Sequence, residues 1–379
     1  MWCCHHANSI DLSKVEFSYL YKDTNVNFDY SIAQQNGTYR LKLNMQLRKV
    51  GENDEIKNLK ITTQKGFKSK KSTPVKIVSQ NQTSSGSFVS YDVLLSPSDT
   101  RHQYLVIYFN FLTRPYVIDI PIGEKIAHPD FIINGKSNQL SLVKKSDTLL
   151  LEAAGGDIGA YNVKYYPDRF GPAAAPFASK YPDADSLLKV KRSDNVSNTV
   201  VVDESDCLVY FSHTSSSEHG AGRYIQRDYF PKNKEFDELI GPLKYISTEE
   251  EFAKLNKAKE KQLAFDKYWL AIIPSKRLAA RTLRNFYARV QKASILFADY
   301  KNGWKTDRGM IYIAYGPPDE VWKTEDREIW KYDGYNGQLS FNFVKTPNEL
   351  SQYHYVLERN KKMANDWYSQ IDRWRKGDI

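Results

Sequence analysis

Residues 303–320 constrain this chain more than any other part of its sequence. They read Gly-Trp-Lys-Thr-Asp-Arg-Gly-Met-Ile-Tyr-Ile-Ala-Tyr-Gly-Pro-Pro-Asp-Glu. A turn-forming segment, 303–309, leads into the apolar residues 310–315, and a Gly-Pro-Pro-Asp turn at 316–319 ends the run. Because the run is apolar on both faces, it predicts a short strand that is buried on both sides.

This block resembles the signature of the GWxTD-domain family, found in bacterial cell-envelope proteins. The resemblance includes an Arg-Gly pair before the apolar run, the Gly-Pro-Pro-Asp turn and a later Glu-Ile-Trp strand. It covers roughly residues 236–357, and Met310, where a basic residue is common, is the one departure. The matching positions are Gly303, Trp304, Thr306, Asp307, Arg308, Gly309, Gly316, Pro317, Pro318, Asp319 and Trp330. The resemblance implies an envelope lipoprotein of the Bacteroidota type, in a family whose biochemical role is poorly defined.

Local structure accounts for these positions without a catalytic role. We expect Gly303 to adopt a positive φ after a helix, and Trp304 to fill the seam between helix and sheet. Asp307 is expected to accept hydrogen bonds from the amides of its own turn. Asp319 is expected to cap the segment that follows the rigid proline pair. We therefore interpret the motif as structural.

Several carboxylates near the motif keep an enzymatic alternative open. Paired carboxylates can act as general acid and base or bind a metal. Five carboxylate side chains lie between residues 307 and 326. Their spacing matches no calcium loop, and no histidine nearby completes a transition-metal site. Without a nucleophile and base pair, such residues seldom catalyse. The residues concerned are Asp307, Asp319, Glu320, Glu325 and Asp326.

Composition narrows the class of protein. A length of 379 residues predicts two to four domains, and 41% hydrophobic residues suit folded ones. The net charge is +9, but the basic residues are dispersed and join no nucleic-acid motif, so we expect no nucleic-acid partner. Three cysteines exclude a disulfide framework. The sequence predicts neither a cofactor nor a metal site.

Two adjacent cysteines near the start of the sequence, Cys3 and Cys4, suggest a lipid anchor. Bacterial lipoproteins begin, after processing, with a lipidated cysteine and a short polar tether, a role that residues 5–13 could fill. An ordinary terminus with incidental thiols is the alternative. Given the family resemblance, we favour lipidation and attachment to the outer membrane, on its periplasmic or its exposed side.

The order of patterns along the chain predicts a multidomain, mainly β protein with an α+β C-terminal part. Short alternating strands separated by turn signals indicate two tandem, Ig-like β-sandwiches. Helical stripes with capping boxes then indicate a connector. The predicted units are a tether at 1–13, sandwiches at 14–126 and 127–234, a helical connector at 235–301 and the GWxTD domain with a C-terminal helix at 302–379.

These expectations lead to one function and two rivals. The best supported is a non-enzymatic binding or scaffold subunit of an envelope protein assembly or secretion complex, with other envelope proteins as partners. The first rival is a carboxylate-based hydrolase of envelope glycan or peptide. The second is a carbohydrate-binding protein that uses exposed aromatic side chains.

Overall fold

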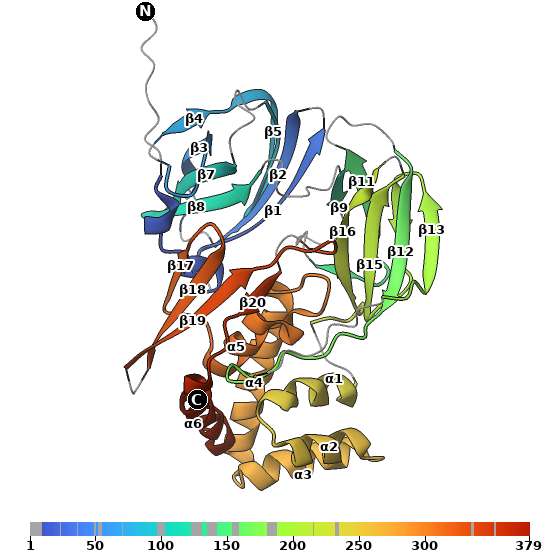
Figure 1. Ribbon diagram of the computed structural model, residues 1–379, viewed down its shortest axis with the longest axis vertical. Coiled ribbons are helices and arrows are strands. Elements are labelled where there is room, and N and C mark those ends of the chain that lie inside the picture. The colour runs from blue at the N-terminus through green and yellow to red at the C-terminus, as the bar shows by residue number, and fades with distance from the viewer. Residues whose placement is uncertain are drawn as a thin grey trace, which may run out of the picture.

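The structure is a computed structural model of the chain, mainly β, with its helices toward the C-terminus (Figure 1). The strands form two units rich in sheet, and a third sheet region lies between the first unit and the helices. The structure describes residues 10–22, 24–35, 37–48, 51, 55–69, 71–96, 103–122, 131–134, 142–153, 159–179, 188–214, 216–231, 235–334, 337–351 and 354–379.

The N-terminal unit consists of two antiparallel four-stranded sheets. Alternation of apolar and polar residues builds it: along β2, every second residue from Tyr39 to Leu47 is buried. One sheet has the order β1 (Val26–Gln35), β2 (Thr38–Leu47), β6 (Phe88–Ser96), β5 (Lys76–Ser85). The other has the order β4 (Ser72–Pro74), β3 (Ile56–Gln64), β7 (Tyr104–Phe111), β8 (Arg114–Pro121).

The middle unit has a five-stranded and a three-stranded sheet. Its pairs are antiparallel except that β10 runs parallel to β16. Cys207 is a buried free thiol, in agreement with the apolar strand around it. The larger sheet has the order β10 (Val143–Lys144), β16 (Ser216–Gln226), β15 (Cys207–His213), β12 (Tyr161–Pro167), β13 (Arg192–Val196); the smaller has β14 (Thr199–Val201), β11 (Thr148–Ala153), β9 (Phe131–Asn134).

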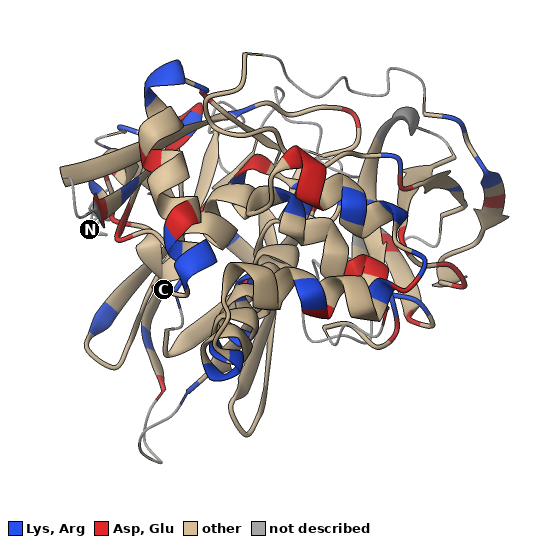
Figure 2. Ribbon diagram, turned by 90° about the horizontal axis from the view of Figure 1, so that it is seen from below, with Lys and Arg blue, Asp and Glu red and all other residues tan. Residues whose placement is uncertain are grey.

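The helices follow where capping signals and apolar stripes predict them. Thr248 and Glu251 form a reciprocal capping box at the start of α2. In α4 the buried residues recur every three or four positions, which gives the helix one core-facing stripe. Figure 2 shows basic and acidic residues interspersed over these helices, as the dispersed charge of the sequence predicts. The helices are α1 (Phe236–Ile240), η3 (Gly241–Tyr245), α2 (Glu249–Lys257), α3 (Lys261–Ile272) and α4 (Lys276–Leu296).

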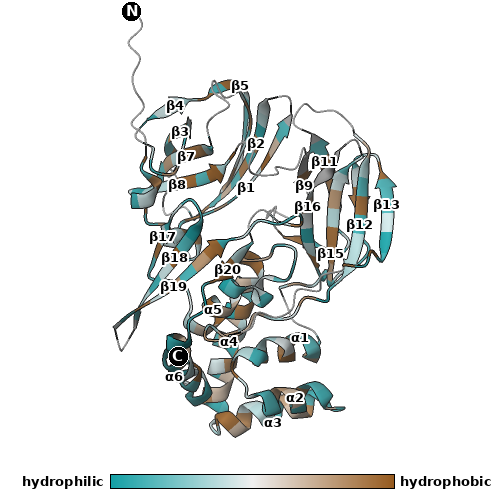
Figure 3. Cartoon of the chain, in the orientation of Figure 1, coloured by the Kyte–Doolittle hydropathy of each residue, from teal (hydrophilic) through white to brown (hydrophobic). Residues whose placement is uncertain are grey.

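The C-terminal part forms a four-stranded sheet between helices. Its strands have the order β17 (Glu320–Lys323), β18 (Arg327–Gly334), β19 (Gly337–Lys345), β20 (Tyr355–Leu357). The sheet is preceded by η4 (Gly303–Lys305) and α5 (Asp307–Tyr315), and followed by η5 (Lys361–Met363) and α6 (Ala364–Lys376). Figure 3 shows α5 as hydrophobic and α6 as mostly hydrophilic, which fits an enclosed and an outer helix.

The apolar run at 310–315 is a helix, so the predicted strand is wrong. The side chain of Thr306 accepts a hydrogen bond from the Gly309 amide and begins α5. Gly316, with φ +91°, ends it. The expected burial is present, because α5 is enclosed on all sides and residues 309–314 are buried. A helix buried all round has no polar face, and its sequence then resembles that of a buried strand.

The apolar core divides in a way that does not follow chain order. One hydrophobic cluster runs from the N-terminal unit into the helices and the C-terminal sheet, whereas the middle unit has a cluster of its own. The N-terminal segment with η1 (Leu12–Lys14) and η2 (Ser18–Leu20) belongs to the shared cluster. The amide of Phe17 donates to the Val321 carbonyl on β17 at 2.8 Å, and the Glu16 carboxylate accepts from the Val321 amide at 3.0 Å. This segment therefore covers the free edge of β17.

Candidate functional site

Two glycines of the motif, Gly303 and Gly309, allow three helical segments to touch. A Cβ on Gly303 would lie 2.2 Å from the Ala293 carbonyl oxygen, and one on Gly309 would lie 2.0 Å from the Gly303 carbonyl oxygen. Gly303 has no positive φ, so the reason predicted for it is wrong. Close backbone approach between α4, η4 and α5 is what excludes a side chain there.

Trp304 packs between helical segments, and it also borders a cavity that the β16 strand of the middle unit lines, which is the only sense in which it lies between helix and sheet as predicted. Its half-buried ring meets the ring of Tyr245 edge-on, with 6.1 Å between centroids. It also covers Gly241, where an added Cβ would lie 3.2 Å from the indole. The backbone carbonyl of Trp304 accepts from the Tyr245 hydroxyl at 2.9 Å. Trp304 thus fixes η4 against η3.

Asp307 joins distant parts of the chain, and the expectation that it serves its own turn is wrong. Its carboxylate accepts from the Leu357 amide on β20 at 2.7 Å and pairs through both oxygens with Arg359, at 2.5 and 3.1 Å. Arg359 also donates to the Ala174 carbonyl at 3.0 Å. Asp307 is 8% exposed, so this pair is largely removed from water. The capping role belongs to Thr306 instead.

Arg308 and Trp330 take part in a buried polar cluster around Glu328, which is 2% exposed. Glu328 accepts from the Tyr21 hydroxyl at 2.8 Å and the Trp330 indole at 3.2 Å, and lies 3.6 Å from Arg308. Burial acts to raise the pKa of Glu328, but Arg308, Lys323 and these hydrogen bonds outweigh it and lower that pKa. The cluster holds the N-terminal segment against the C-terminal sheet.

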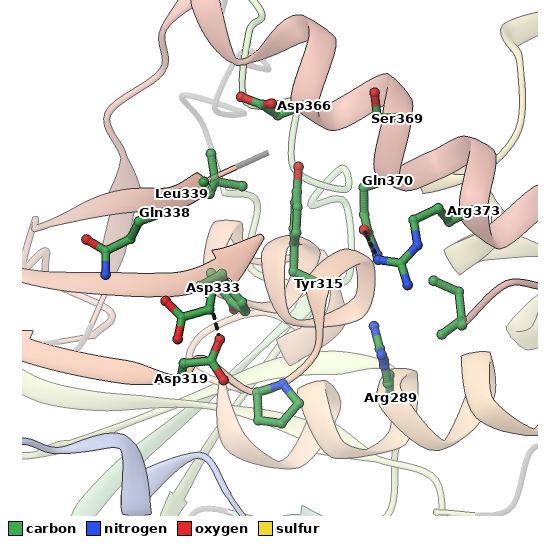
Figure 4. A pocket seen from close by; sticks show the side chains of 14 residues that line it. Arg289, Tyr315, Asp319, Asp333, Gln338, Leu339, Asp366, Ser369, Gln370 and Arg373 are labelled. Atoms are coloured by element: carbon green, nitrogen blue, oxygen red, sulfur yellow. Dashed lines mark hydrogen bonds between the residues drawn. The ribbon is translucent and has the colours of Figure 1, made fainter. Parts of the chain in front are cut away.

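A cavity of about 380 Å³ opens beside the Gly-Pro-Pro-Asp turn (Figure 4). Tyr315 at the end of α5, Arg289 of α4 and Asp366 of α6 line it. Asp319 and Asp333 lie on the opposite wall, where the Asp319 carboxylate accepts from the Asp333 amide at 2.8 Å. Asp319 therefore holds the end of a neighbouring strand, not the segment after it as predicted.

One of the two arginines that line this cavity, Arg289, is bound within the protein itself. Arg289 donates to the carbonyls of Ile313 at 3.3 Å and Ala314 at 3.1 Å, and its guanidinium lies 4.9 Å from the centre of the Trp374 ring. The Ala314 oxygen also accepts from Gln370 at 2.7 Å and from the Trp374 indole at 2.9 Å. Three side chains thus converge on the carbonyl end of α5, where helix carbonyls lack partners. Burial lowers the pKa of Arg289.

The other carboxylates near the motif point to separate partners. Glu320 accepts from the Trp322 indole at 2.8 Å and pairs with Lys331 at 3.3 Å, and Asp326 pairs with Arg327 at 3.1 Å. Of the five carboxylates singled out in the sequence, Asp319 lines the cavity described above. Within the described part of the chain, no group of three or more metal-ligating side chains is placed to hold an ion.

A second cavity, of about 300 Å³, lies between the middle unit and the helices. Trp304 and Lys305 line it from the motif side, and Asp168, Tyr224 and Arg227 line it from the middle unit. Its charges are paired across the gap: Lys305 lies 2.6 Å from Asp168. Sequence reasoning missed both cavities, because each is built from residues far apart in the chain.

The predicted anchor, Cys3 and Cys4, lies outside the described residues. Among the helices that the structure describes, none is long and apolar enough to cross a membrane.

A comparison with protein families finds that the GWxTD domain matches residues 207–376. The match begins at β15, so it takes in the last two strands of the middle unit as well as the helices and the C-terminal sheet. It reaches further upstream than the stretch from which the resemblance was drawn. A comparison with curated proteins finds no match.

Proposed function

Because this chain belongs to the GWxTD-domain family, we propose that it acts as a non-enzymatic binding or scaffold subunit of an envelope protein assembly. In this proposal a lipid on Cys3 or Cys4 anchors it to the outer membrane. A tether of this kind raises the effective concentration of the subunit near membrane-bound partners.

The observation that carries the proposal is how the motif side chains are used. Thr306 caps α5, Asp307 binds Arg359 and the Leu357 amide, and Arg308 pairs with Glu328. Each of these groups forms its hydrogen bonds or ion pairs with other residues of the protein, and the three side chains do not converge on a common cavity. This arrangement favours a rigid platform over a reaction centre.

The two β units support a recognition role. We propose that they form tandem Ig-like sandwiches, given a pair of four-stranded sheets in the first and a five- and a three-stranded sheet in the second. Such units commonly present loops and sheet edges to partners. The long loop at 168–179 is bound to its own chain, since the Asn360 amide donates to the Pro176 carbonyl at 2.9 Å.

Fractionation and native purification test the proposal together. Cys3→Ser/Cys4→Ser in the full-length precursor should move the protein from the membrane to the soluble fraction, and mass spectrometry should find a lipidated N-terminus on the native protein. Purification from membranes after cross-linking should return the same envelope partner in repeated preparations. An unmodified N-terminus ends the anchor, and a protein that purifies alone ends the scaffold role.

Hydrolysis of envelope glycan or peptide is the second candidate, because Asp319, Asp333 and Asp366 border one cavity. The test is turnover of purified envelope glycan by wild type, Asp319→Ala and Asp366→Ala. Asp326→Ala is the matched control, since Asp326 pairs with Arg327 outside that cavity. Turnover that either cavity variant abolishes and the control retains would replace the scaffold proposal.

A further inference from the structure

Strand β5 is an exposed edge of unusual length. All of its ten residues are exposed, so neither face of the strand is covered by the second sheet of the unit. Within the described chain it pairs with β6 on one side and is the last strand of its sheet (Figure 1). Its other side therefore presents a row of backbone amides and carbonyls to solvent.

The other sheet edges in the described chain are protected. The N-terminal segment covers β17 through Phe17 and Glu16. β8 carries Pro115 and Pro121, and β13 carries charged residues at alternate positions, in the sequence RSDNV. β1 lies against β9 of the middle unit. The remaining edge strands, β4, β9, β10, β14 and β20, have two to four residues each. Proline, charge, covering, shortness and bulges are the usual means of blocking edge pairing, and β5 has none of them along 79–85, after a register shift between Ile77 and Ser79.

The charge pattern sharpens this contrast. Residues 77–91 contain no charged side chain, although 26% of the chain is charged. Such a neutral surface does not attract a charged ligand. Alternate backbone donors and acceptors along an open edge are matched by another extended backbone. The occupant that fits β5 is therefore a β-strand.

We propose that β5 pairs with β5 of a second copy of this chain, antiparallel, so that their two four-stranded sheets become continuous. Neither cavity described above is lined by β5, so the edge has no pocket there with which to select the side chains of a foreign strand. A twofold axis requires one residue to face its own copy across the antiparallel pair; with Asn81 there, Gln80 of each copy faces Gln82 of the other, and the two Lys76 residues lie at opposite ends. Gln80, Asn81 and Gln82 meet at the centre, where amide side chains can bond across the pair. The two copies are related by a twofold axis, so the assembly ends at a dimer.

The pairing is independent of the proposed scaffold role, and the experiment addresses the pairing alone. Sedimentation of the full chain should give a mass that rises with protein concentration from 43.8 kDa to twice that value. Amide hydrogen exchange over 76–85 should slow in parallel, and that readout needs no variant. A chain that stays monomeric, or an exchange rate that ignores concentration, overturns the proposal, whatever other protein binds.

Two matched variants locate the contact. Gln80→Lys/Gln82→Lys places like charges at the centre of the pair and should weaken dimerisation about tenfold or more, with an unchanged melting temperature. Ser193→Lys/Asn195→Lys makes the same charge change at exposed positions of the β13 edge and should leave dimerisation as in wild type. If the β5 variant dimerises as wild type does, or the control weakens equally, the contact lies elsewhere and the proposal fails.

Discussion

The N-terminal and middle units are both built of two sheets, yet they join the rest of the molecule differently. The N-terminal unit shares one apolar cluster with the helices and the C-terminal sheet, and Tyr21 and Glu328 form part of a buried polar cluster at the junction. The middle unit keeps a core of its own, and its sheets meet the C-terminal region through polar contacts, whereas its 168–179 loop adds Ala173 and Phe177 to the shared cluster. These include the Lys305–Asp168 pair at 2.6 Å and the bond from the Tyr224 amide to the Asp299 carbonyl at 3.1 Å.

This difference shows that neighbours in sequence need not be the partners in folding. The middle unit lies between the other two in the chain, but the shared core takes in only its 168–179 loop and not its sheets. A large apolar junction makes two units unfold together, whereas a polar one with a cavity lets a unit open by itself. We therefore expect the N-terminal unit and the C-terminal region to unfold as one, and the middle unit to open separately.

The largest expected effect comes from breaking the buried junction with Glu328→Gln. Loss of the charge removes the buried carboxylate that Arg308 and Lys323 face, and removing one member of such an ion pair costs about 3–5 kcal/mol of unfolding free energy. Urea unfolding measures it. Glu358→Gln is the control, because Glu358 pairs with Arg327 in an exposed position and should change stability by about 0.5 kcal/mol or less. Equal losses in both variants would mean that the junction is no stronger than a surface pair.

The same junction should weaken in acid. The pKa of Glu328 in the folded protein is lowered from its usual value of 4.5, so below that value the unfolded chain binds more protons. Stability from this group is complete above pH 4.5 and is lost as the pH falls through the lower, folded pKa. Thermal unfolding between neutral pH and pH 3 should therefore show a steeper decline for wild type than for Glu328→Gln. Parallel curves would contradict the lowered pKa.

Trp304→Ala should have a smaller effect, at the other junction. The ring is half-buried, so its removal costs about 2 kcal/mol instead of the larger value typical of a fully buried tryptophan. The variant should also become more sensitive to protease between the middle unit and the helices, because Trp304 lines the cavity between them. Trp304→Phe keeps the contact with Tyr245 and should restore most of the stability. An unchanged melting temperature for Trp304→Ala would rule out a structural role.

The smallest effect is expected for Asn302→Ala. Its side chain donates to Gln226 on β16 at 3.4 Å and accepts from the Trp304 amide at 3.5 Å, and such long bonds between neutral groups contribute about 0.5–1 kcal/mol. Hydrogen exchange should quicken in β16 and stay unchanged in β18, since the junction opens locally. Faster exchange in both strands would mean that the middle unit is not an independent unit.

Sequence reasoning predicted the elements whose signal is local. Strands with alternating burial, the capping box at Thr248 and the strand with Glu328 and Trp330 all lie where expected. It failed for residues 310–315, because a run without a polar face does not reveal its period. The Thr306 cap and Gly316, nine helical residues apart, were the available signal for a helix. Asp307 with Arg359, and Tyr21 with Glu328, are pairs that depend on the tertiary fold and leave no local pattern.

The N-terminal segment determines how a mechanical load would enter this molecule. A pull on residue 10 meets the bond from the Leu12 amide to the Phe67 carbonyl, at 3.1 Å, and then the bond from the Phe17 amide to Val321 on β17, at 2.8 Å. The first bond fastens the segment to the N-terminal unit, and the second fastens it to the C-terminal sheet. Tension applied at this end is therefore divided between two parts of one core. The middle unit has neither of these two bonds and does not receive this load directly.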